Sequence, residues 1–417
     1  MIIKNNVSKF ILLGLFAYGL QLPVLAIDFE TAFHKAKNND PKFQAAKHEK
    51  DATSAQSNRD WSSYAPTYTY NQTQLPTLNV TSNTQTVSQP LFDAVKGATF
   101  LQAVPRKNSS NSSFLLQTND LALRVFNAMS QIIQANEAIR ANESRLTTLE
   151  SQYKSAKRKY ELGQGTLTDQ LDVQVKYEQA KADDFTLKAN LKSGRDQFKA
   201  IVGEDSGPLD FTLPNKHETF TIGLLDEILV RVEKMNPAVL VAKANEKIAK
   251  LDVLKASGAV LPTVSYNYQK TTYTNVNAEN NGLSILIPLD VGNYIGTYIA
   301  HAKSKQSSST RLETEVKTKV EAERFYQLID AGQQSLKIKG NAMEIARQSV
   351  IANQKSYDAG VKSTTDVLIA IQTLFQARNE YAVSAVQLGG NLLNLLLIGA
   401  EDPDEAVKRT QAFLFRK

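Results

Sequence analysis

The chain repeats itself at an interval of about 197 residues, and this duplication restricts its possible folds more than any other feature. Tyr-Glu-Leu-Gly at 160–163 recurs as Tyr-Asp-Ala-Gly at 357–360, and Thr-Asp at 168–169 recurs at 365–366. Upstream the interval slips by one residue either way, and each matched pair contains a proline: Asp40-Pro41 with Asn236-Pro237, Pro66-Thr67 with Pro262-Thr263, and Pro90-Leu91 with Pro288-Leu289. We therefore predict two structural units of the same design.

Both units show the same order of patterns: an amphipathic helix, two strands, a very long helix, a glycine-containing turn and a shorter helix. The predicted helices cover 29–63, 96–162 and 168–201 in the first unit and 224–257, 294–359 and 365–398 in the second. At about 1.5 Å per residue the longest helix would reach roughly 100 Å. The sequence therefore predicts an elongated, mainly α-helical protein.

The strand segments alternate between two kinds of side chain. Tyr68 and Tyr70 alternate with threonines, and Tyr266 and Tyr268 alternate with Ser265, Asn267 and Gln269. The prolines that frame each hairpin leave room for two strands of about 10 residues, a length that suits a tilted transmembrane strand of about 9–11 residues. A small soluble sheet that caps a coiled coil fits the pattern equally well. The same period of two continues through Ile285, Ile287 and Leu289.

Four strands are too few to close a barrel in a membrane, because closed barrels have about 8 strands or more. An open sheet edge in lipid would leave backbone groups without partners. If the strands span a membrane, several copies must share one barrel, and three copies would give about 12 strands.

The first 26 residues have the pattern of a secretory signal peptide. Lys4 and Lys9 supply the positive region, 10–20 is apolar, and Val24-Leu25-Ala26 provides small residues before the cleavage point. We expect 1–26 to be removed, and we place the two units at 27–215 and 216–417, with the division near 211–220 and a short C-terminal tail.

Several classes of function lack the residues they need. The chain has no cysteine, and its four histidines have no metal-ligand spacing: His34, His48, His217 and His301. No nucleophile elbow is present, and the 48 basic and 42 acidic residues are interspersed rather than gathered into a basic arm. We therefore predict no catalytic, cofactor or metal site, no enzyme activity and no nucleic-acid partner.

The two turns between the long and shorter helices carry capping signals. Thr166 and Asp169 have capping-box spacing, as do Ser363 and Asp366. Gly163 and Gly360 fit the position just after a helix, where glycine is favoured.

Taken together, the duplication, the Asp/Asn-Pro and Pro-Leu steps and the Tyr-x-x-Gly turns followed by Asp resemble the TolC family of outer-membrane efflux and secretion channels, over about residues 28–402. The resemblance implies a homotrimer with a long α-helical barrel and a 12-stranded transmembrane β-barrel, four strands from each chain. It implies a position in outer-membrane lipid and across the periplasm. A periplasmic adaptor and an inner-membrane transporter of the ABC, RND or MFS type would be its partners in drug efflux or type I secretion.

The resemblance also implies roles for residues at the two turns. Tyr357 and Lys362 match a tyrosine and a basic residue that tether the second hairpin, and Thr168 and Asp169 match their partners on the first. Asp366 matches one member of an acidic ring at the pore constriction, but Ile369 stands where the second acid is expected. Because lysine cannot form the planar two-point contact of arginine, Lys362 would make a looser tether. Helix capping alone explains Asp169 and Asp366 equally well.

A periplasmic coiled-coil adaptor is the alternative function. An adaptor would contain one helical hairpin flanked by glycine-rich β domains, whereas this chain has two hairpin patterns and only 19 glycines. The patterns therefore favour the export duct.

Overall fold

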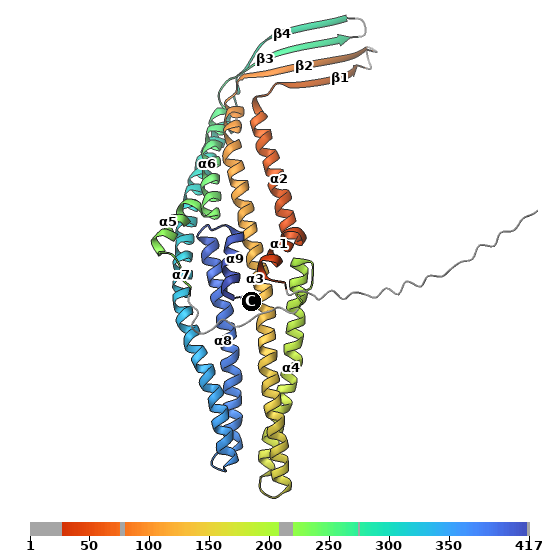
Figure 1. The fold of residues 1–417 in the computed structure, drawn as a ribbon. Helices are drawn as coiled ribbons and strands as arrows, with labels where there is room; N and C mark the ends of the chain where they lie inside the picture. Colours follow the sequence, from red (N-terminus) through yellow and green to blue (C-terminus); the bar gives the residue numbers. More distant parts are fainter. Residues whose placement is uncertain (1–26, 76–79, 208–219, 274–275, 415–417) are drawn as a thin grey trace, which may run out of the picture.

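The computed structural model of the chain describes residues 27–75, 80–207, 220–273 and 276–414. The predicted signal peptide, the unit boundary near 211–220 except Phe220, and His217 lie outside these residues. A four-stranded sheet lies at one end of the molecule, and the tips of two helical hairpins lie at the other (Figure 1). The molecule is elongated, as the sequence predicts.

Both halves of the chain contain the same series of elements. The first half consists of α1 (Phe29–Asn39), α2 (Pro41–Trp61), the short 3-10 helix η1 (Ser62–Tyr64), β1 (Thr67–Leu75), β2 (Val80–Phe92), α3 (Ala94–Glu161) and α4 (Leu167–Val202). The second half consists of α5 (Leu225–Met235), α6 (Pro237–Gly258), β3 (Thr263–Tyr273), β4 (Val276–Leu286), α7 (Val291–Asp358), α8 (Thr364–Ile398) and α9 (Pro403–Leu414).

The first helix of each half is broken, and the prediction of one continuous helix over 29–63 and 224–257 is wrong. Asp40 adopts an extended conformation, because a following proline disfavours the helical region. Its carboxylate accepts a hydrogen bond from Phe43 N at 2.8 Å and caps α2. Asn236 plays the same part before Pro237, with its side-chain oxygen accepting from Ala238 N and Val239 N. The Asp/Asn-Pro pairs therefore mark a break rather than a helix interior.

The two longest helices have the same length. α3 and α7 each contain 68 residues, whereas α4 has 36 and α8 has 35. α2 and α4 pack along different parts of α3, and α6 and α8 pack along α7 in the same way (Figure 1). α3 also contacts α6 and α8, which joins the two halves side by side.

The sheet is antiparallel throughout and has the order β1-β2-β3-β4. Its strands contain 9, 13, 11 and 11 residues, close to the predicted 10. A register shift falls between Pro90 and Phe92, where proline has no N–H to donate. β4 ends at Leu286, so the prediction that its alternation continues to Ile287 and Leu289 is wrong.

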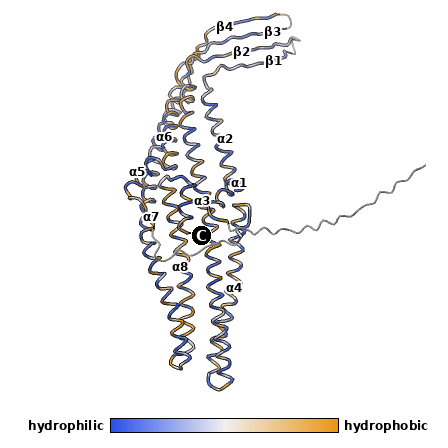
Figure 2. Tube along the Cα trace, in the orientation of Figure 1, coloured by the Kyte–Doolittle hydropathy of each residue, from blue (hydrophilic) through white to orange (hydrophobic). Residues whose placement is uncertain are grey.

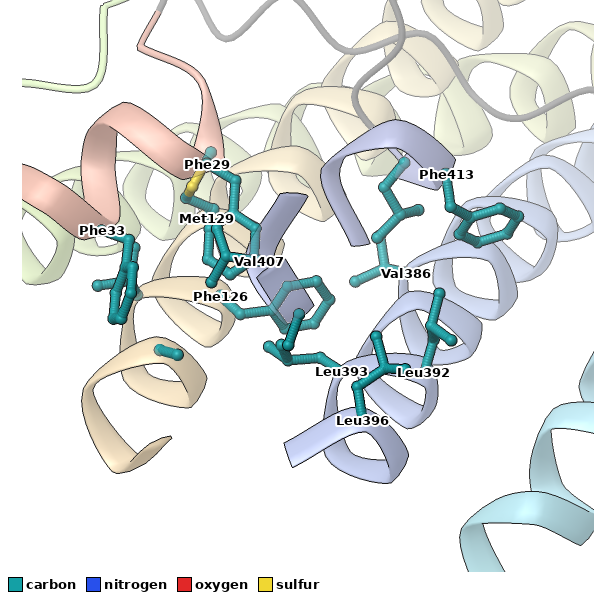
Figure 3. Close-up of a cluster of buried hydrophobic side chains, with 14 of the residues drawn as sticks. Phe29, Phe33, Phe126, Met129, Val386, Leu392, Leu393, Leu396, Val407 and Phe413 are labelled. Carbon is teal, nitrogen blue, oxygen red and sulfur yellow. The ribbon is translucent and has the colours of Figure 1, made fainter. Parts of the chain in front are cut away.

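The main core lies near the middle of the molecule, where α1 and α9 meet the long helices. Phe29 packs edge-on against Phe126 of α3 at a ring-centroid distance of 5.7 Å. Figure 3 shows Val407 of α9 and Leu393 of α8 in the same cluster. The predicted C-terminal tail therefore includes a packed helix, α9.

A second, smaller core lies close to the hairpin tips and draws residues from all four long and shorter helices: Leu149 and Ala156 of α3, Val173 and Ala180 of α4, Tyr357 of α7, and Val367, Leu368 and Ile371 of α8. Hydrophobic and hydrophilic residues are interspersed along these helices rather than segregated by region (Figure 2). The middle of α3 and the C-terminal half of α8 are nevertheless buried almost all round, because the main core lies there.

Candidate functional site at the hairpin tips

The two hairpin tips have nearly identical backbone turns. Gly163 follows the end of α3 with φ at +71°, and Gly360 follows the end of α7 with φ at +74°. This left-handed conformation is strained for residues with a Cβ atom. Gly163 N donates to Tyr160 O at 3.0 Å, and Gly360 N donates to Tyr357 O at 3.0 Å. The prediction of glycine caps at both turns is confirmed.

Both helices that leave the tips begin with a reciprocal capping box. In α8, Asp366 N donates to Ser363 Oγ at 3.2 Å, and Ser363 N donates to Asp366 Oδ2 at 3.0 Å. In α4, Thr166 and Asp169 make the same pair of contacts. The hydrogen bond from the Thr166 hydroxyl is the main cause that holds the pKa of Asp169 below its ordinary value. Asp169 is therefore anchored in its ionised form.

Two contacts join the first tip to the second within one chain. Lys159 Nζ of α3 lies 3.9 Å from the centroid of the Tyr357 ring, a cation–π contact. The Thr364 hydroxyl, buried at the start of α8, also helps to lower the pKa of the Asp169 carboxyl group. A further hydrogen bond joins Gln152 of α3 to Gln354 of α7 just above the tips. Weak polar contacts thus join the two tips in addition to the small core that the hairpins share.

The predicted tether residues all lie at the tips but are not bonded to one another within the chain. Tyr357 is only 9% exposed, and its ring belongs to the small core. Lys362 lies 3.6 Å from Asp366 of its own hairpin, and Thr168 is exposed. Across these described turns, no hydrogen bond or ion pair joins Tyr357 or Lys362 to Thr168 or Asp169. Their role as tethers stays a prediction.

Asp366 and Ile369 lie on the first two turns of α8. The Asp366 carboxylate is partly exposed, and the hydrogen bond from the Ser363 hydroxyl is the main cause that lowers its pKa. Ile369 is 61% exposed, although it is an aliphatic residue. Asp366 therefore offers a charged side chain with an apolar neighbour one turn away, and its place in an acidic ring at a pore constriction stays a prediction.

Comparison with known proteins agrees with this architecture. The sequence profile of the "Outer membrane efflux protein" family matches residues 228–398. The outer membrane protein TolC of Vibrio cholerae is 22% identical over 401 residues, covering 88% of this chain and 91% of its own. The alkaline protease secretion protein AprF of Pseudomonas aeruginosa is 24% identical over 408 residues, covering 88% and 83%. The structure of the Campylobacter jejuni CmeC outer membrane channel superposes with a TM-score of 0.76 at 13% identity, covering 93% and 89%.

These matches support the TolC family of outer-membrane factors as the family that this chain resembles. The structure and these similarities confirm the predicted fold class, a long helical structure with a four-stranded sheet in each chain, and the predicted function as an outer-membrane exit duct. The protein is located in the outer membrane and extends into the periplasm. The family is one of channel and transport proteins.

Among the described residues one helix, α8, is long and apolar enough to cross a membrane by composition, but 61% of its apolar window is buried within the chain. It packs against α7, α3 and α9. We therefore interpret α8 as a core helix.

The four tyrosines predicted to lie in the membrane share one face of the β1-β2-β3-β4 sheet. Tyr68 pairs with Val87, and Val87 pairs with Tyr268, so these side chains form one cross-strand row. Tyr70 and Tyr266 lie two residues away along their strands and therefore point to the same side. We call this side the tyrosine face; it carries the even-numbered residues of β1 and β3 and the odd-numbered residues of β4 and of β2 up to Gln89. Beyond the register shift it carries Phe92 of β2, which pairs with Val264.

Sequence reasoning missed Lys159 and Thr364, the residues that make the observed contacts between the tips. Each adjoins a residue that the repeat singles out, namely Tyr160 and Ser363. The repeat matches Tyr160 to Tyr357, yet Tyr160 is 44% exposed and Tyr357 is buried. Only the packing of the two hairpins distinguishes these tyrosines.

Proposed function

We propose that three copies of the chain form one closed exit duct of a tripartite efflux pump or type I secretion system, for passive export of small molecules or proteins. The observation that carries this proposal is an open four-stranded sheet attached to helices of about 100 Å. Such a sheet cannot remain open in lipid, and such helices are long enough to line a tunnel below it.

The two edge strands support closure by further copies. β1 and β4 each pair with one neighbour only in the sheet that the structure describes. In a membrane their free backbone groups require partners, and β1 of one copy against β4 of the next supplies them. The start of α7 also exposes an apolar stripe at helical spacing: Val291, Tyr294, Ile295 and Tyr298. This stripe would pack against the adjacent copy.

The tips are the proposed gate. The contacts between them are cation–π and hydrogen-bonding interactions near the surface, each worth about 0.5–3 kcal/mol. Three copies would repeat each contact, so that the closed state is held firmly yet opens when a partner offers competing contacts. Lys362, Tyr357, Thr168 and Asp169 would add the contacts between copies, and Asp366 would set the charge of the constriction.

The partners follow from this placement of the gate. A periplasmic adaptor would contact the exposed tips, and an inner-membrane transporter of the ABC, RND or MFS type would deliver the cargo. Efflux and secretion components among the relatives support this assignment. The duct contributes no covalent chemistry.

The division of the chain into a signal peptide and two repeats is part of the proposal. We assign 1–26 to a signal peptide, 27–215 to the first TolC-like repeat and 216–417 to the second. The equal lengths of α3 and α7 and the matching caps at both tips support two repeats derived from one ancestral unit.

Planar-bilayer recording tests the channel function. The purified protein should insert and produce single-channel currents, and variants that cut the tip contacts should conduct more than wild type. If protein that native mass spectrometry finds to be trimeric inserts into the bilayer but carries no current, the proposed channel function is contradicted.

A further inference from the structure

The tyrosine face is apolar only in its basal half, next to the helices. Its residues fall into cross-strand rows, and the first three rows from the base contain no charge. Their members, in order from the base, are Phe92, Val264 and Ile285, then Gln89, Tyr266 and Leu283, then Tyr68, Val87, Tyr268 and Asn281. Gln89 satisfies its amide by donating to the backbone oxygens of Tyr64 and Pro90.

From the fourth row to the end of the hairpins, the tyrosine face carries charged and polar side chains. Lys270 of β3 lies directly opposite Glu279 of β4, and their charged atoms are 2.9 Å apart. Beyond this ion pair the tyrosine face carries amide and hydroxyl side chains: Gln72, Asn83, Thr272 and Asn277.

Tyr70, in the fourth row, follows the same division. Its hydroxyl is 3.1 Å from Asn83 Oδ1, toward the hairpin end. A tyrosine hydroxyl that meets polar side chains on the outer side of an apolar surface is typical of a membrane–water boundary.

The opposite face offers no alternative surface for lipid. It carries an uncharged set of hydroxyl and amide side chains over most of its length, among them Thr69, Thr86, Asn267 and Asn280. Thr84 and Thr271 on this face lie opposite each other, with their hydroxyl oxygens 3.4 Å apart. A face of this kind suits a water-filled lumen, which leaves the basal tyrosine face for lipid.

The three uncharged rows have less height than the apolar band of a membrane barrel. They cover about five residues of strand, or roughly 17 Å at about 3.3 Å per residue, whereas the apolar band of a membrane barrel is about 25 Å tall. The connection from β4 to α7 continues the apolar surface below the sheet, because Ile287 is exposed and Leu289 is 92% exposed. The missing height is therefore available on the periplasmic side of the sheet.

We propose that lipid acyl chains contact only the basal three rows of the tyrosine face and the β4–α7 connection, and that the Lys270–Glu279 row marks the outer boundary of the hydrocarbon. This inference rests on the proposed function as a membrane duct. The distal halves of the hairpins then project beyond the hydrocarbon, and the membrane reaches down to the start of α7.

Depth-dependent fluorescence quenching tests this placement, because the chain has no native cysteine. Single cysteines replace Leu283, Leu289, Asn83, Asn277 and Ser284 in the full-length protein, and each receives a bimane label. The labelled proteins are reconstituted into vesicles of phosphatidylcholine and phosphatidylglycerol, with or without nitroxide groups on the phosphatidylcholine acyl chains. Ser284 is the matched control, since it neighbours Leu283 but points to the opposite face.

The labels at 283 and 289 should lose most of their fluorescence, and those at 83, 277 and 284 should lose almost none. Strong quenching at 83 and 277 would overturn the proposal by placing the whole sheet in hydrocarbon, and an unquenched label at 289 would overturn its lower limit. Flotation separates the two levels of failure. Protein that does not float with the vesicles contradicts the duct itself, whereas protein that floats with the wrong quenching pattern contradicts only the placement.

Discussion

At the scale of single residues, the closed tip depends on Lys159 and Thr364. Lys159→Met removes the charge over Tyr357 at nearly constant length, and Thr364→Val removes a buried hydroxyl at nearly constant volume. The double variant should lose about 1–3 kcal/mol of contact energy in each copy and therefore show a larger single-channel conductance. Lys157→Met, at an exposed position two residues away, is the matched control and should conduct like wild type. Equal conductance of all three proteins would remove these residues from the gate.

Asp169 gives the tip a defined pH dependence. Its pKa is lowered in the folded protein, chiefly by the Thr166 hydroxyl, so ionised Asp169 stabilises the tip at pH values above the ordinary carboxyl value of 3.8. This contribution is lost as the pH falls through the lowered pKa. Conductance should therefore stay constant between pH 8 and pH 5 and rise only below about pH 4. In Asp169→Asn this acid-induced rise should be reduced; an undiminished rise would assign it to other carboxyl groups.

At the scale of elements, the breaks between α1 and α2 and between α5 and α6 differ in one instructive way. Asp40 pairs with Arg124, whose guanidinium nitrogens lie 2.8 and 2.7 Å from its two carboxylate oxygens. Burial opposes ionisation of Asp40, but the Arg124 and Phe43 hydrogen bonds outweigh it and lower the pKa. Asn236 instead donates to Ile398 O at 2.8 Å. The same cap therefore carries a charge in one half and none in the other.

Exchange of these two caps should destabilise both halves. Asp40→Asn keeps the cap but weakens the pairing of Arg124, and should cost about 1–3 kcal/mol. Asn236→Asp sets a carboxylate against the Ile398 carbonyl oxygen without a cation, and should cost at least as much. Thermal unfolding followed by circular dichroism measures both. If either exchange leaves the unfolding temperature unchanged, the hydrogen bonds described here do not stabilise the breaks.

The elements that sequence predicts well are those with local causes. The capping boxes at Thr166 and Ser363 and the glycine turns at Gly163 and Gly360 depend on neighbours within a few residues, and all four are confirmed. The helix break before Pro41 was also encoded locally, but the apolar pattern on both sides concealed it. By contrast, the burial of Tyr357 and the packing of α9 depend on residues far away in the chain, which no single sequence pattern specifies.

At the scale of the whole molecule, one chain is an incomplete structure. Its sheet has two free edges, and its long helices lie side by side without closing into a barrel. Apolar side chains are exposed at the start of α7. Each feature is unfavourable alone and is satisfied by closure with further copies. The tip contacts, the membrane strands and the tunnel therefore all require the same assembly.

Disulfide cross-linking between β1 and β4 tests this closure most directly. Cysteines are introduced in pairs, one at Thr67, Thr69 or Asn71 of β1 and one at Asn280, Gly282 or Ser284 of β4, and the protein is oxidised in outer-membrane preparations. β1 and β4 are separated by two strands within one chain, so a cross-link forms only between copies. We predict that at least one pair yields covalent trimers and nothing larger, because a closed ring of three has no free edge. Bands beyond the trimer, or no covalent trimer with any pair, would contradict a barrel shared by three copies.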